Sequence, residues 1–250
     1  MSEMIRTINL CKENILFDVN FSMKKGELVA VMGPSGSGKS TLLYELSGMD
    51  RPDGGQILFA GNDIGKYSED KCADMRLNQM GFVFQQMNML PNLNIMDNII
   101  LPACQSRKTK KDGKQDERSI KKEAAEQMKK VGIAGLEKRK ITEVSGGQLQ
   151  RACICRAMIN HPELILADEP TGALNKASSE EIMDEFIRLN RDGMSVLIVT
   201  HDSKIASCCD RVIYMLDGKI TGECELGKYD ASQKHDREMK INNWLEKHGW

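Results

Sequence analysis

The sequence predicts an α/β fold in which a mostly parallel sheet is interrupted by a helical subdomain. Short apolar runs of strand length recur along the chain, and after residue 160 segments with helical spacing separate them. Strands that alternate with helices indicate a parallel sheet, because parallel neighbours need a crossover connection between them. Residues 87–160, by contrast, show helical patterns and no apolar strands.

The first third of the chain is predicted to hold strands around one helix. Phe17, Val19 and Phe21 alternate with polar residues, as in a half-buried strand. The apolar run at residues 28–32 leads into a glycine-rich loop, which indicates a central strand over residues 27–32. The helix after that loop and two further strands are expected over residues 41–46, 56–59 and 81–84.

The remainder of the chain returns to the sheet after a helical stretch. Helices are expected over residues 119–131, 148–159 and 178–189, and strands over 164–167, 196–200 and 211–216. A hairpin-like turn follows at residues 217–219, and a last helix runs through Trp244. We divide the chain into the first part of the core (1–86), the helical subdomain (87–160), the second part of the core (161–225) and a C-terminal tail helix (226–250).

Composition excludes several classes of protein. The 250 residues are 40% hydrophobic and 28% charged, with a net charge of −1, so no bulk attraction to nucleic acid is expected. The N-terminus lacks an apolar signal segment, and no run is long enough to span a bilayer. The eight cysteines lack chelating spacings, and we expect small buried side chains with free thiols in a cytosolic protein.

One glycine-rich loop fits the pattern G-x-x-x-x-G-K-[ST] between the central strand and its helix. Its residues are Gly33, Pro34, Ser35, Gly36, Ser37, Gly38, Lys39, Ser40 and Thr41. Glycines let backbone N–H groups approach an anion, and the helix N-terminus adds a positive potential. Lys39 suits the β- and γ-phosphates, and the Ser40 hydroxyl suits Mg²⁺. We therefore predict a nucleoside triphosphate site rather than an ordinary turn.

Two carboxylates follow the apolar strand at residues 164–167. Ligands of parallel sheets bind at the carboxyl ends of the strands, where Asp168 and Glu169 are expected. Asp168 would hold Mg²⁺ through water, and Glu169 would orient or deprotonate the water that attacks the γ-phosphate. Such a pair alone is more often a solvated loop, and the phosphate loop in the same chain favours the catalytic interpretation.

A second glycine-rich segment opens the helix predicted at residues 148–159. It consists of Ser145, Gly146, Gly147 and Gln148, which place a hydroxyl and backbone amides at a helix N-terminus. An N-capped helix with a flexible start is the alternative. Since one nucleotide hardly needs two such cradles, either two anions bind or the second cradle completes a site on another copy.

With these motifs the chain resembles the ATP-binding subunit of ATP-binding cassette (ABC) transporters over residues 5–222. Lys39 lies in the position of the Walker A motif, Asp168 closes Walker B, and residues 144–148 match the LSGGQ signature with Val for Leu. Gln85 matches the Q-loop and His201 the switch histidine. Residues 81–85 and 168–174 are most similar to the subgroup of macrolide-exporter, lipoprotein-release and bacitracin-resistance ATPases. The C-terminal residues 244–250 resemble the bacitracin-resistance branch in particular.

The resemblance implies a P-loop NTPase (RecA-like) core with N-terminal antiparallel strands, and a mechanism. Two copies form a homodimer on ATP binding, each ATP lying between the Lys39 loop of one copy and the Ser145 loop of the other. Glu169 activates water, His201 contacts the γ-phosphate, and Gln85 joins the Mg²⁺ site to the helical subdomain.

The resemblance also implies a partner and a location. An integral membrane permease holds the cytoplasmic subunit at the inner face of the membrane and uses the hydrolysis for export or for resistance to antimicrobial peptides or similar amphiphiles. The alternative is a regulatory or mechanical ATPase of the cell-division type, whose membrane partner moves no substrate. No nucleic-acid partner is expected.

Two departures from the family pattern bear on function. Asn175 stands where the family usually has Asp, and loss of that charge is expected to weaken the dimer contact or slow turnover. The family stacks adenine on an aromatic residue upstream of the phosphate loop, yet residues 9–12 contain none. We therefore predict weak discrimination between ATP and GTP.

Three further patterns have weaker implications. Residues 107–114 form a basic loop, expected to be solvated or else to bind phospholipid headgroups or nucleic acid. Met75, Met80, Met87, Met89 and Met96 are expected to fill the core or to line a groove for a short helix of the membrane subunit. A face made of Met239, Ile241, Trp244 and Leu245 is expected to dock on its own domain.

Overall fold

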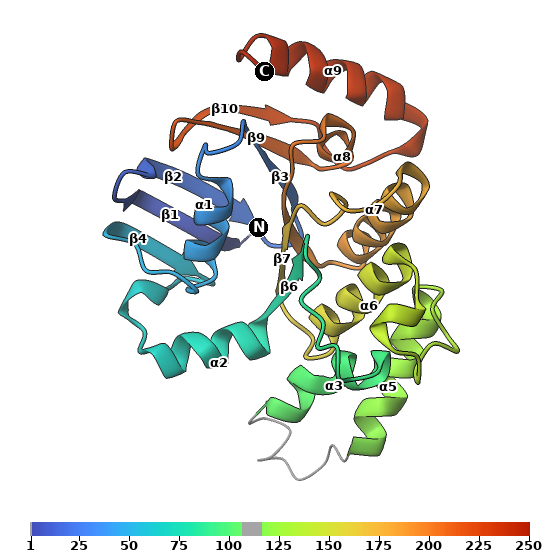
Figure 1. Cartoon of the computed structure of the whole chain (residues 1–250). Coiled ribbons are helices and arrows are strands. Elements are labelled where there is room, and N and C mark those ends of the chain that lie inside the picture. Colours follow the sequence, from blue (N-terminus) through green and yellow to red (C-terminus); the bar gives the residue numbers. More distant parts are fainter. Residues whose placement is uncertain (1, 107–116) are drawn as a thin grey trace.

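The protein is described by a computed structural model that covers residues 2–106 and 117–250 (Figure 1). Its main sheet has six strands in the order β10-β9-β3-β8-β7-β6, and all neighbours are parallel except β9 and β10. The strands are β3 (Leu28–Met32), β6 (Met80–Phe84), β7 (Leu164–Asp168), β8 (Ser195–Val199), β9 (Arg211–Leu216) and β10 (Lys219–Glu225). The predicted α/β fold is confirmed, and β3 is central.

A second sheet has four antiparallel strands in the order β2-β1-β4-β5. They are β1 (Glu3–Lys12), β2 (Leu16–Lys24), β4 (Gly54–Phe59) and β5 (Asn62–Asp63). The predicted alternation holds from Val19 onward, but Phe17 is 45% exposed. A bulge explains the difference, because one extra residue of β2 lies between the pairs Leu10–Val19 and Lys12–Leu16, and Asp18 has a φ of 54°.

Some helices cover the main sheet, and others form a group to one side of it (Figure 1). They are α1 (Lys39–Leu46), α2 (Glu69–Gln79), α3 (Ile95–Gln105), α5 (Glu117–Lys130), α6 (Gly146–Met158), α7 (Lys176–Arg191), α8 (Ser203–Ser207) and α9 (Lys234–Glu246). Within the described residues, α3, α5 and α6 lie together where the helical region was expected. The domain boundaries stay a prediction, and the basic loop at 107–114 lies outside the described residues.

The central strands β3 and β8 of the main sheet are buried on both faces, as a parallel sheet between covering layers requires. Leu28, Ala30 and Met32 of β3 belong to one apolar cluster, whereas Val29 and Val31 belong to another. The helices α3, α5 and α6 contribute to the first cluster, and α1 with the antiparallel sheet contributes to the second. Among the described residues no helix is long and apolar enough to cross a membrane.

Most of the sulfur-containing side chains fill the core. Met75, Met80, Met89 and Met96 are at most 9% exposed. The buried thiols are those of Cys72, Cys153, Cys155, Cys208, Cys209 and Cys224, and burial raises the pKa of Cys155 to about 12. The described residues contain no group of three or more His, Cys, Asp or Glu side chains that could hold a metal ion.

The tail helix α9 lies along β9 and β10 (Figure 1). Its buried face consists of Arg237, Ile241 and Leu245, whereas Met239 is 49% exposed. The prediction that Met239 belongs to this face was therefore wrong. Residues four apart share a helix face, and Arg237, four positions before Ile241, occupies the place expected for Met239. Arg237 donates hydrogen bonds to the carbonyl oxygens of Ser207 (2.8 Å) and Cys209 (2.7 Å).

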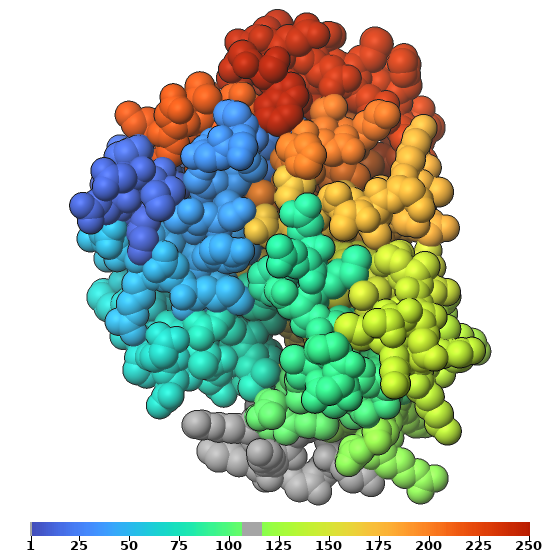
Figure 2. All heavy atoms as spheres, viewed as in Figure 1, coloured from blue at the N-terminus to red at the C-terminus, as the bar shows by residue number. Residues whose placement is uncertain are grey.

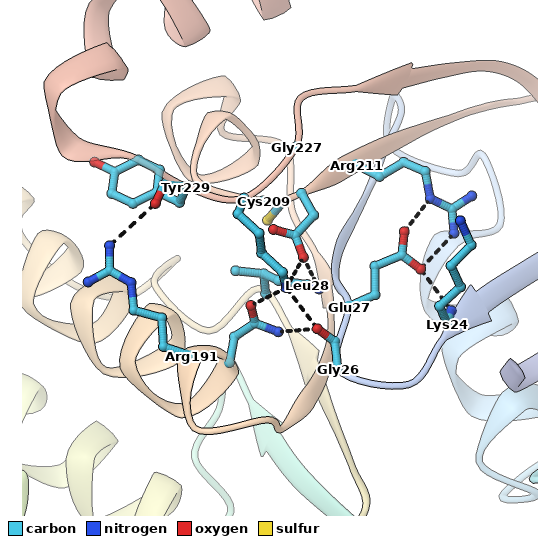
Figure 3. A network of polar contacts seen from close by, with 12 residues as sticks. Lys24, Gly26, Glu27, Leu28, Arg191, Cys209, Arg211, Gly227 and Tyr229 are labelled. Carbon is cyan, nitrogen blue, oxygen red and sulfur yellow. Dashed lines mark hydrogen bonds and ion pairs between the residues drawn. The ribbon is translucent and has the colours of Figure 1, made fainter. Parts of the chain in front are cut away.

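A network of polar contacts holds the segment between β10 and α9 against the main sheet (Figure 3). The Lys228 ammonium donates to a carboxylate oxygen of Asp210 (2.7 Å) and to the carbonyl oxygen of Gly26 (2.8 Å). Asp210 in turn accepts the backbone N–H of Leu28 at 2.9 Å, where β3 begins. Hydrogen bonds to charged groups are stronger than those between neutral groups, so these contacts tie the tail to the strand that leads to the phosphate loop.

Candidate functional site

The phosphate loop turns the chain from the carboxyl end of β3 into α1, and two of its glycines are required sterically. A Cβ at Gly33 would come within 2.1 Å of the Met215 carbonyl oxygen. Gly38 caps α1 with a φ of 94°, a left-handed conformation that side chains with a Cβ rarely adopt. The tight turn brings successive backbone N–H groups to the N-terminus of α1, the arrangement that binds phosphate groups.

Lys39 folds back over this loop. Its ammonium donates to the carbonyl oxygens of Gly33 and Pro34, each at 2.8 Å. Burial lowers the pKa of Lys39, and the nearby carboxylates Glu169 and Asp168 oppose that shift. The Ser37 hydroxyl oxygen is buried and has no hydrogen-bond partner. A cation and an unpaired hydroxyl inside one loop fit an anionic ligand such as a polyphosphate.

Ser40 and Asp168 meet behind the loop. The Ser40 hydroxyl donates to Oδ1 of Asp168 at 3.1 Å, and the Tyr44 hydroxyl lies 3.4 Å from Oδ2. Burial raises the pKa of Asp168, and the negative charge of Glu169 adds to the effect. A divalent cation would relieve this accumulation of buried negative charge, and hydroxyl and carboxylate oxygens are the ligands that Mg²⁺ prefers. These residues therefore fit the predicted Mg²⁺ site.

Tyr44 is a residue of this site that the sequence analysis missed. It lies four positions after Ser40 on α1, so both side chains point from one helix face toward the end of β7. That spacing was the available signal. Burial raises the pKa of Tyr44, and the negative charge of Asp168 adds to the effect, so the phenol stays protonated and able to donate.

Glu169 and His201 form a pair at the carboxyl ends of β7 and β8. Nδ1 of His201 lies 2.8 Å from Oε1 of Glu169, and the Glu169 side chain is 17% exposed. The Glu169 backbone has a φ of 46°, and its N–H donates to the Val199 carbonyl oxygen at 2.9 Å. Strained backbone of this kind is held by its surroundings and is common at active sites. The carboxylate is thereby held in a fixed position beside the imidazole.

A cavity of about 540 Å³ opens in front of the phosphate loop. Its lining residues are Ile15, Gly33, Pro34, Ser35, Gly36, Gly38, Lys39, Ser40, Thr41, Glu169, Val199, His201 and Trp250. Cavities of this size hold small-molecule ligands in other proteins. Lys39, Ser40, Glu169 and His201, which lie far apart in sequence, thus face one cavity, with Asp168 hydrogen-bonded to Ser40.

Two predicted elements lie outside this cavity. The Gln85 side chain packs on Gly172, where an added Cβ would meet Nε2 at 2.8 Å. The second glycine-rich segment forms a capping box at the start of α6, in which the Ser145 N–H donates to Oε1 of Gln148 at 2.9 Å. Ser145 is exposed and is the N-cap of α6. Figure 1 shows α6 on the helical side of the molecule, away from α1.

The comparisons with known proteins agree with this geometry. The family described as ABC transporter matches residues 16–172. The chain belongs to the ABC transporter family. The match begins at β2 and ends just after the Asp168–Glu169 pair, so it includes the phosphate loop, Gln85 and the capped start of α6.

Relatives in the predicted subgroup are similar along most of this ABC cassette. The lipoprotein-releasing system ATP-binding protein LolD of Aquifex aeolicus is 38% identical over 89% of this chain and 98% of its own length. The macrolide export ATP-binding/permease protein MacB of Pasteurella multocida is 43% identical over 84% of this chain but 31% of its own length.

A solved structure shows the same fold in a dimer. The post-hydrolysis state of the ATP-binding cassette MJ0796, bound to ADP and Pi, superposes with a TM-score of 0.80 at 36% identity. It covers 90% of this chain and 100% of that one. The protein is therefore an ATPase cassette with the nucleotide-binding fold of the family.

Proposed function

We propose that this ABC cassette is the motor subunit of a transporter whose permease is a separate membrane protein. The similarity to transporter ATP-binding proteins supports the transport role, and the observation that carries the mechanism is the separation of the two glycine-rich helix starts. Lys39, Glu169 and His201 face one cavity, whereas Ser145 is exposed elsewhere. Two copies arranged head to tail would place the Ser145 loop of one against the cavity of the other, so that ATP closes a homodimer and hydrolysis opens it.

In the proposed reaction the residues of the cavity divide the chemistry between them. The loop from Gly33 to Thr41 holds the triphosphate, and Lys39 neutralises charge on its β- and γ-phosphates. Ser40 and Asp168, with Gln85 after a movement away from Gly172, would hold Mg²⁺. When bound, that ion neutralises charge on the phosphate oxygens.

Glu169 is proposed as the general base for the attacking water. Its carboxylate accepts a proton from the water as oxygen attacks the γ-phosphorus, and the bond to the bridging oxygen breaks to give ADP and phosphate. The contact of 2.8 Å with Nδ1 of His201 holds the carboxylate in position, and His201 is left free to contact the γ-phosphate through its other nitrogen.

A second cavity, of about 400 Å³, suits the permease. It lies between α2, β6 and α6, and Met49, Met80, Phe82, Phe84 and Pro102 are among its apolar lining residues. Met49 is 44% exposed, which leaves soft apolar surface available to a short helix of the partner. Of the five methionines named from the sequence, Met80 lines this cavity, and the groove for a partner helix stays a prediction.

The cargo is proposed from the subgroup. We propose export of, or resistance to, antimicrobial peptides or similar amphiphiles, with the cassette held at the cytoplasmic face of the membrane by its permease. A regulatory ATPase with a partner that moves no substrate is the second candidate. Recovery of the membrane protein by co-purification, followed by peptide transport in vesicles, separates the two.

The Glu169→Gln variant tests the proposed mechanism. The amide cannot accept the proton, so hydrolysis should fall by roughly 100- to 10,000-fold, the usual contribution of a general base, while ATP binding persists. Size-exclusion chromatography with ATP should then show a dimer. Glu180→Gln, an exposed glutamate on α7, is the control. Hydrolysis at the unmodified rate would refute the assigned base, and a monomer at all ATP concentrations would refute the shared site.

A further inference from the structure

The cavity at the phosphate loop has an apolar wall to which the proposed reaction assigns no role. Ile15 and Trp250 line it beside the phosphate loop. Both side chains are large and apolar, yet they are 39% and 45% exposed. Exposed apolar surface that borders a polar cleft is typical of a ligand-binding wall. A triphosphate has no apolar part, whereas the base of a nucleotide does.

We propose that the indole of Trp250, carried on the tail that follows α9, is the stacking surface for the base of the bound nucleotide, together with Ile15. The inference rests on the proposed function, because it assigns the base of the same ATP whose phosphates the Gly33–Thr41 loop holds. It also makes nucleotide affinity depend on the docking of α9, a segment outside the family match at residues 16–172.

Ile15 is held directly against the phosphate loop. A Cβ at Gly38 would meet the Ile15 carbonyl oxygen at 3.3 Å and its Cγ2 at 3.7 Å. The backbone continues the connection, because Phe17 N–H donates to the Gly218 carbonyl oxygen and Gly218 N–H donates to that of Ser37. The Ile15 side chain thus keeps a fixed relation to the loop that binds the phosphates.

Trp250 is held from the other side by the tail. Its ring packs edge-on against Tyr214 of β9, with 6.2 Å between centroids and an interplanar angle of 77°. Its backbone N–H donates to the Leu245 carbonyl oxygen at 3.2 Å, and Leu245 is itself fully buried. In Figure 2 the dark red end of the chain meets the blue segment around the phosphate loop. The indole is therefore positioned before any nucleotide arrives.

The size and chemistry of the wall fit a purine. The lining of the cavity of about 540 Å³ includes one flat aromatic ring, that of Trp250, and the branched side chain of Ile15. Stacking on an aromatic ring tolerates every base, because each has a π face, and it adds affinity without reading hydrogen bonds. The tail thereby supplies the aromatic stacking surface that residues 9–12 lack. Because stacking does not distinguish the bases, weak discrimination between ATP and GTP is still expected.

Equilibrium binding to Trp250→Ala tests the proposal, with magnesium ATP and magnesium tripolyphosphate as probes. Loss of one stacking contact should weaken ATP binding roughly 5- to 100-fold. Tripolyphosphate affinity should not change, since it has no base. Trp250→Phe should recover most of the ATP affinity, and Met239→Ala, an exposed change on α9, should bind both probes as the unmodified chain does.

The possible outcomes separate this inference from the function beneath it. Unchanged ATP affinity in Trp250→Ala, or an equal loss for both probes, would overturn the stacking role while leaving the phosphate site intact. An unmodified chain that binds neither probe would overturn both proposals.

Indole fluorescence gives a second reading that needs no change at Trp250. In a Trp244→Phe background only Trp250 emits, because the sequence has two tryptophans. ATP and GTP should quench or shift this emission, and tripolyphosphate should not. Identical emission with and without saturating ATP would contradict a base stacked on the ring.

Discussion

The two glycine-rich helix starts of this cassette have similar sequences and different surroundings. The loop before α1 lies in a cavity with carboxylates, a histidine and an indole, and its Lys39 is hydrogen-bonded to the loop itself. The segment before α6 satisfies its own N-terminus by a capping box and leaves Ser145 exposed. In the proposed mechanism the first is one side of the ATP site, and the second completes the site of another copy.

Removal of Lys39 should have the largest effect on the first loop. Lys39→Ala deletes the cation that the phosphates require, so ATP affinity should fall roughly 100-fold or more. Isothermal titration calorimetry measures it, with Lys66→Ala, whose side chain is 76% exposed, as the control. ATP affinity within a factor of two of the unmodified value would show that this loop is not the phosphate site.

The helices α1 and α6 each bury one polar side chain without a partner, and the two side chains differ in whether they can ionise. Glu45 in α1 and Gln150 in α6 are both buried without hydrogen-bond partners, but only Glu45 titrates. Burial raises the pKa of Glu45 from 4.5 to about 7. The folded state then holds a proton that the unfolded state releases, so the free energy of unfolding should fall by roughly 3 kcal/mol from pH 4.5 to pH 7.

The comparison of Glu45→Leu with Gln150→Leu measures that contribution. The free energy of unfolding is measured in urea across this pH range. The fall between pH 4.5 and pH 7 that Glu45 causes should be absent in Glu45→Leu and present in Gln150→Leu. Well below pH 4.5 both states of Glu45 are protonated, so the free energy of unfolding no longer changes with pH through this group. An unaltered pH profile in Glu45→Leu would show that Glu45 ionises at its ordinary pKa in the folded chain.

A charge at Ser145 should break the second loop alone. Ser145→Glu would bring a carboxylate toward the phosphates of the other copy, and the repulsion should reduce ATP-dependent dimerisation roughly 10-fold or more in the Glu169→Gln background. ATP binding by the monomer should not change, and Ser145→Thr, which keeps the capping hydroxyl, should dimerise normally. Analytical ultracentrifugation decides, and a dimer of unchanged affinity would exclude this segment from the interface.

The smallest expected effect is at Asn175. Its side-chain oxygen accepts the Ser178 N–H at 3.0 Å and caps α7, a role that Asp fills equally well. Asn175→Asp should therefore leave the melting temperature nearly unchanged, while the restored charge raises ATP turnover roughly two- to fivefold. Steady-state phosphate release tests this. Turnover equal to that of the unmodified chain would show that the missing charge has no part in the cycle.

Local patterns predicted the strands, the helices and the chemistry at their ends. Residues 28–32, 164–168 and 195–199 are short apolar runs, and the polar groups that follow them were expected at one sheet edge. Periodicity failed where tertiary contacts intervened. The bulge in β2 turns Phe17 outward, and Arg237 rather than Met239 fills the buried face of α9 because carbonyl oxygens of two segments converge there.

The sequence by itself determined which loop has the phosphate-binding pattern and which acids follow β7, because these depend on residues that are neighbours along the chain. Only the tertiary structure decided that His201 meets Glu169, that Tyr44 reaches Asp168, and that Trp250 lies at the nucleotide cavity. These contacts join segments far apart in sequence. The order of the strands and the docking of α9 bring them together, and neither is encoded in a local pattern.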